Sequence, residues 1–143
     1  MENLKILAVV NNKIMFNSTW YDLLIKPPLN PPAGIFLPVW IFMYTAIFVS
    51  LILFIIRYSR TPKTKGIILF VLHMILNVAW SPIFFGLKNI GFALVILILM
   101  VITGILVLVE FYKVSRLSSY ILIPYFLWIC FALYLNTGFF ILN

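Results

Sequence analysis

Apolar residues form four long runs between residue 34 and the C-terminus, separated by short polar gaps. The runs are Gly34 to Ile56, Gly66 to Leu87, Asn89 to Val109 and Leu117 to Asn143. A helix of about 20 apolar residues crosses a hydrocarbon core about 30 Å thick, so each run is long enough to span a membrane. Because no water satisfies the backbone inside a bilayer, each run must be helical. The pattern predicts an all-α membrane protein with four complete transmembrane helices.

The N-terminal apolar run is shorter and is interrupted by the polar triplet at residues 11–13. It has no small-residue cleavage site, so it does not resemble a signal peptide. The stretch from Leu4 to Phe16 is also shorter than about 17 residues, the usual minimum for a span. We therefore expect one transmembrane domain over residues 1–143, divided into an incomplete first helix (1–17), a proline-rich loop (18–33) and four transmembrane helices (34–143).

The segment from Trp20 to Gly34, called here the proline strap, contains Pro27, Pro28, Pro31 and Pro32. Each proline fixes its own φ and pushes the residue before it toward an extended conformation. The strap is therefore expected to be rigid and to have a definite shape. It precedes the first complete helix, at the place where water, lipid headgroups and helix ends meet.

Three of the four predicted helices carry a stripe of polar and aromatic residues at helical spacing. The stripes consist of Trp40 and Tyr44; of His73, Asn77, Trp80, Ser81 and Phe84; and of Tyr125, Trp128, Ala132 and Asn136. Pro82 interrupts the second stripe, and a proline there predicts a kink that opens space in a bundle. The helix over residues 89–109 is almost wholly aliphatic and is expected to be a wall or a lipid-facing partner.

Composition and charge agree with the helix pattern. Hydrophobic residues make up 65% of the chain and charged residues 9%, against about a quarter charged in a soluble domain. Six of the ten basic residues lie in the gaps at 57–65 and 110–116, whereas the opposite side of the predicted spans has only Lys26 and Lys88. The positive-inside rule therefore places both gaps in the cytoplasm and the proline strap outside, and explains the bases without nucleic acid.

The inventory of reactive side chains excludes most enzyme classes. The chain has one histidine, one cysteine and three acidic residues. Neither a nucleophile with its base and orienting acid nor a metal site with three or four ligands can be assembled from them. We expect no catalytic residue and no metal site, so any reaction would use the chemistry of a bound ligand.

A set of motifs follows in order from Trp20 to the C-terminus. The motifs are Trp20-Tyr21, Lys26-Pro27, Pro31-Pro32 and Trp40; Asn77, Trp80-Ser81 and Phe84-Phe85; and Pro124-Tyr125, Trp128, Phe131-Ala132 and Asn136. This set resembles the TspO/MBR family of tryptophan-rich sensory proteins and translocator proteins, relatives of the peripheral benzodiazepine receptor. The resemblance covers nearly the whole chain.

The resemblance implies a TspO-like bundle of five helices, often dimeric, that binds porphyrins and other flat apolar ligands in a pocket capped by the proline loop. It implies porphyrin or haem as a ligand and no obligatory cofactor, with membrane lipid and a second copy as partners. A bacterial cell membrane is favoured, or the outer mitochondrial membrane in a eukaryote. The expected ligand-binding residues are Pro31, Pro32, Trp40, Tyr44, His73, Asn77, Trp80, Tyr125, Trp128 and Ala132.

Three functions remain open. The first is binding of a tetrapyrrole by a sensor, scavenger or transporter, and the second is slow light-dependent porphyrin degradation that would involve Trp40 and Trp128. The third is a sterol-binding, lipid-binding or structural membrane partner without a small ligand. Two features depart from the family pattern, namely the incomplete first helix and His73, where an amide is common.

His73 has two interpretations, and so have Trp40 and Trp128, namely stacking on a flat ligand or interfacial anchoring and packing. His73 is a candidate haem ligand, but we favour a hydrogen bond to a neighbouring helix because polar groups commonly join helices in membranes. Trp20 is expected only to anchor the outer loop, whereas Trp128 is expected to contact the ligand because Ala132 on the same face leaves room for it.

Overall fold

The computed structural model describes Asn3 and residues 20–143 of the chain. The incomplete first helix expected over residues 1–17 lies outside the described residues, Asn3 excepted, and stays a prediction. The described elements are the short 3₁₀ turn η1 (Trp20–Leu23), helix α2 (Ala33–Ile56), helix α3 (Thr64–Ser81), the π-helical turn η2 (Pro82–Gly86), helix α4 (Ile90–Val114) and helix α5 (Arg116–Leu142).

The four predicted transmembrane helices are confirmed. The segments Gly34–Ile56, Thr64–Gly86, Ile90–Val114 and Arg116–Leu142 are long and apolar enough to cross a membrane, and residues 20–143 contain no strand. One boundary was wrong, since α4 continues beyond Val109 to Val114. In the added part of the helix the buried Glu110 carboxylate lies 2.9 Å from Lys113 Nζ and 3.4 Å from Lys65 Nζ, and both cations compensate its charge.

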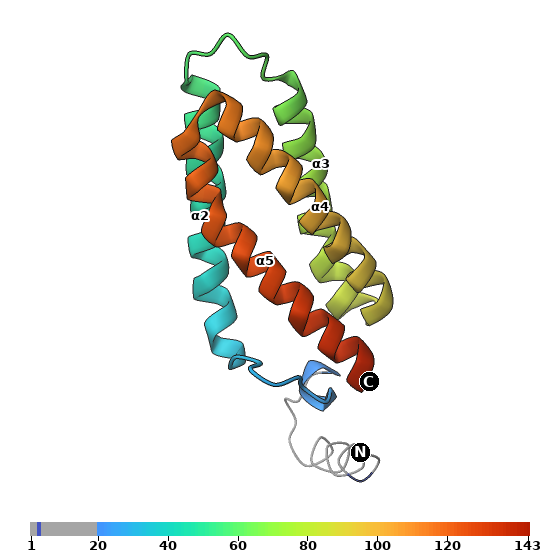
Figure 1. The fold of residues 1–143 in the computed structure, drawn as a ribbon. Helices are drawn as coiled ribbons and strands as arrows, with labels where there is room; N and C mark the ends of the chain where they lie inside the picture. The colour runs from blue at the N-terminus through green and yellow to red at the C-terminus, as the bar shows by residue number, and fades with distance from the viewer. Residues whose placement is uncertain (1–2, 4–19) are drawn as a thin grey trace.

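The helices run alternately up and down, with α4 packed against α3 and α5, and α5 packed against α2 (Figure 1). The loop between α2 and α3 and the junction between α4 and α5 lie at one end of the bundle, called here the basic end. The proline strap and the C-terminus lie at the other end. At the basic end α2 and α5 lie close together, and they diverge toward the strap.

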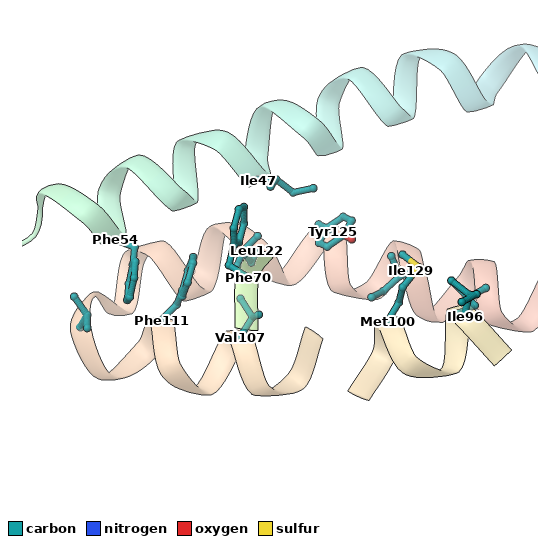
Figure 2. Packing of buried hydrophobic residues seen from close by; sticks show 12 residues of the cluster. Ile47, Phe54, Phe70, Ile96, Met100, Val107, Phe111, Leu122, Tyr125 and Ile129 are labelled. Atoms are coloured by element: carbon teal, nitrogen blue, oxygen red, sulfur yellow. The ribbon is translucent and has the colours of Figure 1, made fainter. Parts of the chain in front are cut away.

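The core near the basic end is filled by aromatic rings. Phe54 of α2 stacks on Phe111 of α4, with ring centroids 4.1 Å apart and planes 7° from parallel (Figure 2). Phe70 of α3 lies against the same Phe111 ring at 5.9 Å. Gly66 makes this packing possible, because a Cβ there would lie 2.8 Å from Phe54 Cζ.

Two serines join α2 to α5 by reciprocal hydrogen bonds. Ser50 Oγ lies 2.7 Å from the carbonyl oxygen of Ser118, and Ser118 Oγ lies 2.6 Å from the carbonyl oxygen of Ser50. Both serines are completely buried. Small side chains that hydrogen-bond across the interface let two transmembrane helices approach closely, and this pair fixes where α2 and α5 meet.

The interruption expected at Pro82 takes the form of a π-helical turn. Proline has no N–H to donate, so the α-helical ladder of α3 ends at Ser81. The next turn is one residue wider, and the N–H of Leu87 donates to the carbonyl oxygen of Pro82 at 2.9 Å. This turn places Phe84 and Phe85 at the strap end of the bundle.

Candidate functional site

A cavity of about 850 Å³ lies at the strap end, between the diverging halves of α2 and α5 and the end of α3 with η2. Its volume is within the range of about 300 to 1,000 Å³ that is usual for small-molecule sites. It is lined by Trp20, Tyr21, Asp22, Phe36, Leu37, Trp40, Trp80, Ser81, Phe84, Phe85, Lys88, Trp128, Ala132, Leu135, Asn136 and Phe139. All four tryptophans of the chain are in this set.

Trp40 and Trp128 form the wall between α2 and α5. Their rings meet edge to face, with centroids 6.3 Å apart and planes at 86°. The Trp128 Nε1 atom is buried and has no hydrogen-bond partner, alone among the side-chain nitrogens and oxygens of the described residues. Buried indole N–H groups normally find an acceptor, so this unpartnered donor is an exception to the usual rule.

Trp80 forms the opposite wall and is held in place. Its Nε1 donates to Oδ1 of Asn136 at 3.0 Å, and Asn136 Nδ2 donates to the carbonyl oxygen of Ile90 at 3.1 Å. The Trp80 ring also stacks on Phe84, with centroids 5.1 Å apart. The position of this ring is therefore set before any ligand binds.

The strap closes the cavity through η1. Trp20 lies edge-on against Phe84 with centroids 5.6 Å apart, and Tyr21 lies against Phe139 at 5.6 Å. Trp20 therefore lines the cavity, and the expectation that it only anchors the outer loop was wrong. Its position along the chain, before the prolines, gave no sign that the strap folds back over the bundle.

The rest of the strap is attached to α5. Pro27 packs so closely against Gly138 that a Cβ at residue 138 would overlap the proline ring. Tyr134 Oη donates to the carbonyl oxygen of Pro28 at 2.8 Å. The Asn143 side chain exchanges two 2.9 Å hydrogen bonds with the backbone of Ile25. These contacts determine the path of the strap, whereas Pro31 and Pro32 do not line the cavity.

Four other expected ligand-binding residues form a hydrogen-bonded chain toward the basic end, outside the cavity lining. Tyr44 Oη donates to Asn77 Oδ1 at 2.6 Å, and Asn77 Nδ2 donates to Tyr125 Oη at 2.7 Å. Tyr125 Oη lies 2.6 Å from His73 Nε2, and His73 Nδ1 lies 2.8 Å from Thr103 Oγ1. The chain ties together α2, α3, α4 and α5.

The hydrogen-bond directions fix the state of His73. Thr103 Oγ1 lies 2.9 Å from the Leu99 carbonyl oxygen and donates its proton there, so it accepts from the Nδ1–H of His73. Nε2 then accepts from Tyr125, and the imidazole is neutral with both nitrogens engaged. The histidine has the interhelical role that we favoured, and the structure leaves no free ring nitrogen to ligate an iron.

The three stripes thus divide into two groups along the helix axes. Trp40, Trp80, Trp128 and Ala132 line the cavity as expected, together with Ser81, Phe84 and Asn136 from the same stripes. His73 and Tyr125 instead line a separate space of about 10 Å³, room for at most one water molecule. Helical spacing showed which residues share a face, but not how far along that face the cavity extends.

The cavity also has lining residues that the stripes did not indicate. They include Phe36, Leu37, Lys88, Leu135 and Phe139. The four apolar ones lie within predicted transmembrane helices, where an apolar residue type does not distinguish a cavity face from a lipid face. Among the described residues no group of three or more His, Cys, Asp or Glu side chains could hold a metal ion.

Comparison with known proteins identifies the family. The profile of the TspO/MBR family matches residues 4–142. The chain belongs to the TspO/MBR family. It is 34% identical over 120 residues to the tryptophan-rich protein TspO of Chlorobaculum tepidum, covering 83% of this chain and 76% of that protein. It is 37% identical over 125 residues to TspO of Bacillus cereus, covering 87% and 81% of the two chains.

The eukaryotic relatives show similar identity. The chain is 36% identical over 119 residues to the human translocator protein, covering 82% of this chain and 70% of that protein. As a TspO/MBR protein with four described spans, it is an integral, multi-pass membrane protein. Both the aromatic cavity and the hydrogen-bonded chain lie within the matched residues.

Proposed function

We propose that this TspO/MBR protein binds a tetrapyrrole in the aromatic cavity at the strap end. The observation that carries the proposal is a cavity of about 850 Å³ to which every tryptophan of the chain contributes. A porphyrin offers broad flat faces on which the indole rings can pack.

The geometry also supports retention of a flat ligand. Trp40 and Trp128 enclose the deep side, Trp80 is fixed on the other side, and Trp20 lies over the mouth. Trp128 lies about 21 Å along α5 from its end at Leu142, so a ring in contact with it is well inside the membrane. Water is excluded there, which favours an apolar ring over its hydrated state.

The test is a titration of the purified protein with protoporphyrin IX in the dark, followed by tryptophan fluorescence. Because all four tryptophans line the cavity, we expect quenching of most of the emission. Ala132→Phe fills the cavity with a ring and should weaken binding at least about 10-fold, a change of about 1.4 kcal/mol. Illumination of the same samples tests degradation through loss of the porphyrin absorption band.

A matched control variant lies on the same helix. Leu127 is 62% exposed on the outer face of α5, so Leu127→Phe introduces the same ring without entering the cavity. It should bind protoporphyrin as the parent does. Equal quenching in Ala132→Phe and the parent, or equal weakening in both variants, would show that the cavity is not the binding site.

A further inference from the structure

We propose that Lys88 binds a carboxylate of the ligand at the cavity mouth, so that the site selects flat apolar acids over neutral compounds of the same shape. This inference rests on the proposed function and goes further, because it assigns a chemical class and a recognition residue. Three observations support it: the backbone conformation of Lys88, its position, and the charges of the cavity lining.

The backbone at Lys88 is strained. Its φ is 54°, in the left-handed region that L-residues with a Cβ rarely adopt. Hydrogen bonds on both sides hold the corner, from Leu87 N to the Pro82 carbonyl oxygen at 2.9 Å and from Asn89 N to the Ile83 carbonyl oxygen at 3.2 Å. A left-handed residue commonly ends a helix, where glycine is the usual choice, so the unusual feature at this helix end is the lysine side chain.

The position of Lys88 is suited to a ligand with one polar edge. It follows the spanning segment that ends at Gly86, so its ammonium group lies near the membrane surface. Lys88 lines the aromatic cavity and also a second hollow of about 420 Å³, formed with Leu87, Asn89, Ile90, Gly91, Phe140 and Asn143. A carboxylate on a short chain can therefore reach the ammonium group while the ring stays in the cavity.

The lining that the structure describes carries two charged side chains of opposite sign, Lys88 and Asp22, and of these only Lys88 can pair with an anion. Among the described residues that line the aromatic cavity, Lys88 is the one with a basic side chain. The remaining lining is mainly aromatic and aliphatic. An unpaired carboxylate is costly to bury in such surroundings, so a ligand acid group is expected to stay beside the cation. The acidic side chain of the lining is Asp22, which belongs to the strap.

The experiment compares protoporphyrin IX, which has two carboxylates, with its dimethyl ester, which has the same ring and none. Both are titrated by tryptophan quenching in phosphatidylcholine nanodiscs, and partition into empty nanodiscs is subtracted. The parent should favour the acid about 5-fold, a preference that falls as salt concentration rises. Lys88→Gln should bring the acid-to-ester ratio to about one, and Lys88→Arg should keep it.

Two further variants separate charge from strain and from surface potential. Lys88→Gly removes the charge and suits the left-handed backbone, so the thermal midpoint should rise while the preference for the acid is lost. Lys26 is exposed at the same end of the molecule and is absent from the cavity lining. Lys26→Gln should therefore keep the parental ratio.

The outcomes of this experiment are distinct. Equal binding of acid and ester by the parent would overturn the role of Lys88 and leave the proposed porphyrin site intact. If Lys88→Gln keeps the preference for the acid, the role of Lys88 would also be overturned and the proposed porphyrin site would remain. Absence of quenching by either compound would overturn the proposed function, and the role of Lys88 with it.

Discussion

At the scale of single residues, two indole N–H groups on facing walls of the cavity have different roles. Trp80 Nε1 is bonded to Asn136, so its ring is fixed by the protein. Trp128 Nε1 is buried without an acceptor. A buried donor without a partner destabilises a folded protein by about 1 to 3 kcal/mol. Trp128 is therefore expected to contribute to binding, through its ring in the cavity lining, more than to folding.

Trp128→Phe and Tyr125→Phe form a pair that tests this distinction. Trp128→Phe breaks no hydrogen bond of the empty protein, so stability should change little while porphyrin affinity falls several-fold. Tyr125→Phe removes the partner of His73 Nε2 and Asn77 Nδ2, so the free energy of unfolding should fall by about 1 to 2 kcal/mol while affinity stays near the parental value.

Unfolding in sodium dodecyl sulfate and the quenching titration measure the two quantities in the same preparations. The assignment would be contradicted if Tyr125→Phe weakened porphyrin binding more than Trp128→Phe did. That result would return the hydrogen-bonded chain to the ligand site, where the stripes and the family resemblance had placed it.

At the scale of elements, the strap depends on a close approach to α5. Gly138 is the point of contact, because any Cβ there would overlap Pro27. Tyr134 and Asn143 hold the strap on either side of this contact by hydrogen bonds to its backbone. The glycine is required for space and not for an unusual φ, since the structure has no glycine with positive φ among the described residues.

Gly138→Ala should displace the strap and speed the release of ligand. Stopped-flow displacement of bound protoporphyrin should show an increased dissociation rate, with the association rate changed less. Gly34→Ala is the matched control, because a Cβ at residue 34 would meet no atom within 4 Å. It should release ligand at the parental rate, and similar rates in both variants would show that the strap does not retain the ligand.

The sequence predicted the helices and their inner faces correctly, but not the depth of the cavity. On α2 the stripe divides between Trp40, which lines the cavity, and Tyr44, which lies in the hydrogen-bonded chain. On α5 it divides in the same way between Trp128 and Tyr125. In each helix the residue nearer the basic end belongs to the closed part of the bundle, because α2 and α5 converge there. Convergence depends on packing between distant segments, which periodicity does not report.

The contacts of the strap could not be predicted from the sequence either. Its prolines predicted stiffness, but Trp20 and Pro27 are placed by Phe84 and Gly138, which follow them by more than 60 and 110 residues respectively. For Lys88, the sequence pattern indicated only a positive charge on the external side. Its left-handed backbone follows from the π turn at Pro82, which sequence analysis had expected only as a kink.

At the scale of the whole molecule, the two ends differ in charge and in packing. The basic end carries Arg57, Arg60, Lys63, Lys65, Lys113 and Arg116, and its core is closed by the stacked phenylalanine rings. The strap end carries the cavity. Lys63 Nζ donates to the carbonyl oxygens of Ile55 and Arg57, both at 2.6 Å, so one of these cations also caps α2. The positive-inside rule predicts that the cavity opens away from the cytoplasm.

Single cysteines at two exposed sites test this orientation without altering charge. Tyr58 at the basic end is 86% exposed and Leu29 in the strap is 81% exposed. In a Cys130→Ala background, Tyr58→Cys should react with an impermeant maleimide only from the cytoplasmic side, and Leu29→Cys only from the outside. Labelling of both cysteines from one side would contradict the four-span topology. Labelling of Tyr58→Cys from the outside and Leu29→Cys from the cytoplasm would mean that the protein has the opposite orientation.

The serine pair that joins α2 to α5 has a consequence for insertions and deletions. Trp40 precedes Ser50 by ten residues, and Trp128 follows Ser118 by ten residues, so both indoles lie about 15 Å from the same junction on antiparallel helices. The two rings meet because the helix stretches from the serine pair to each tryptophan have the same length. One residue inserted into either stretch would turn its indole by about 100° around the helix and shift it by about 1.5 Å. These two stretches should therefore tolerate substitution far better than any change in length.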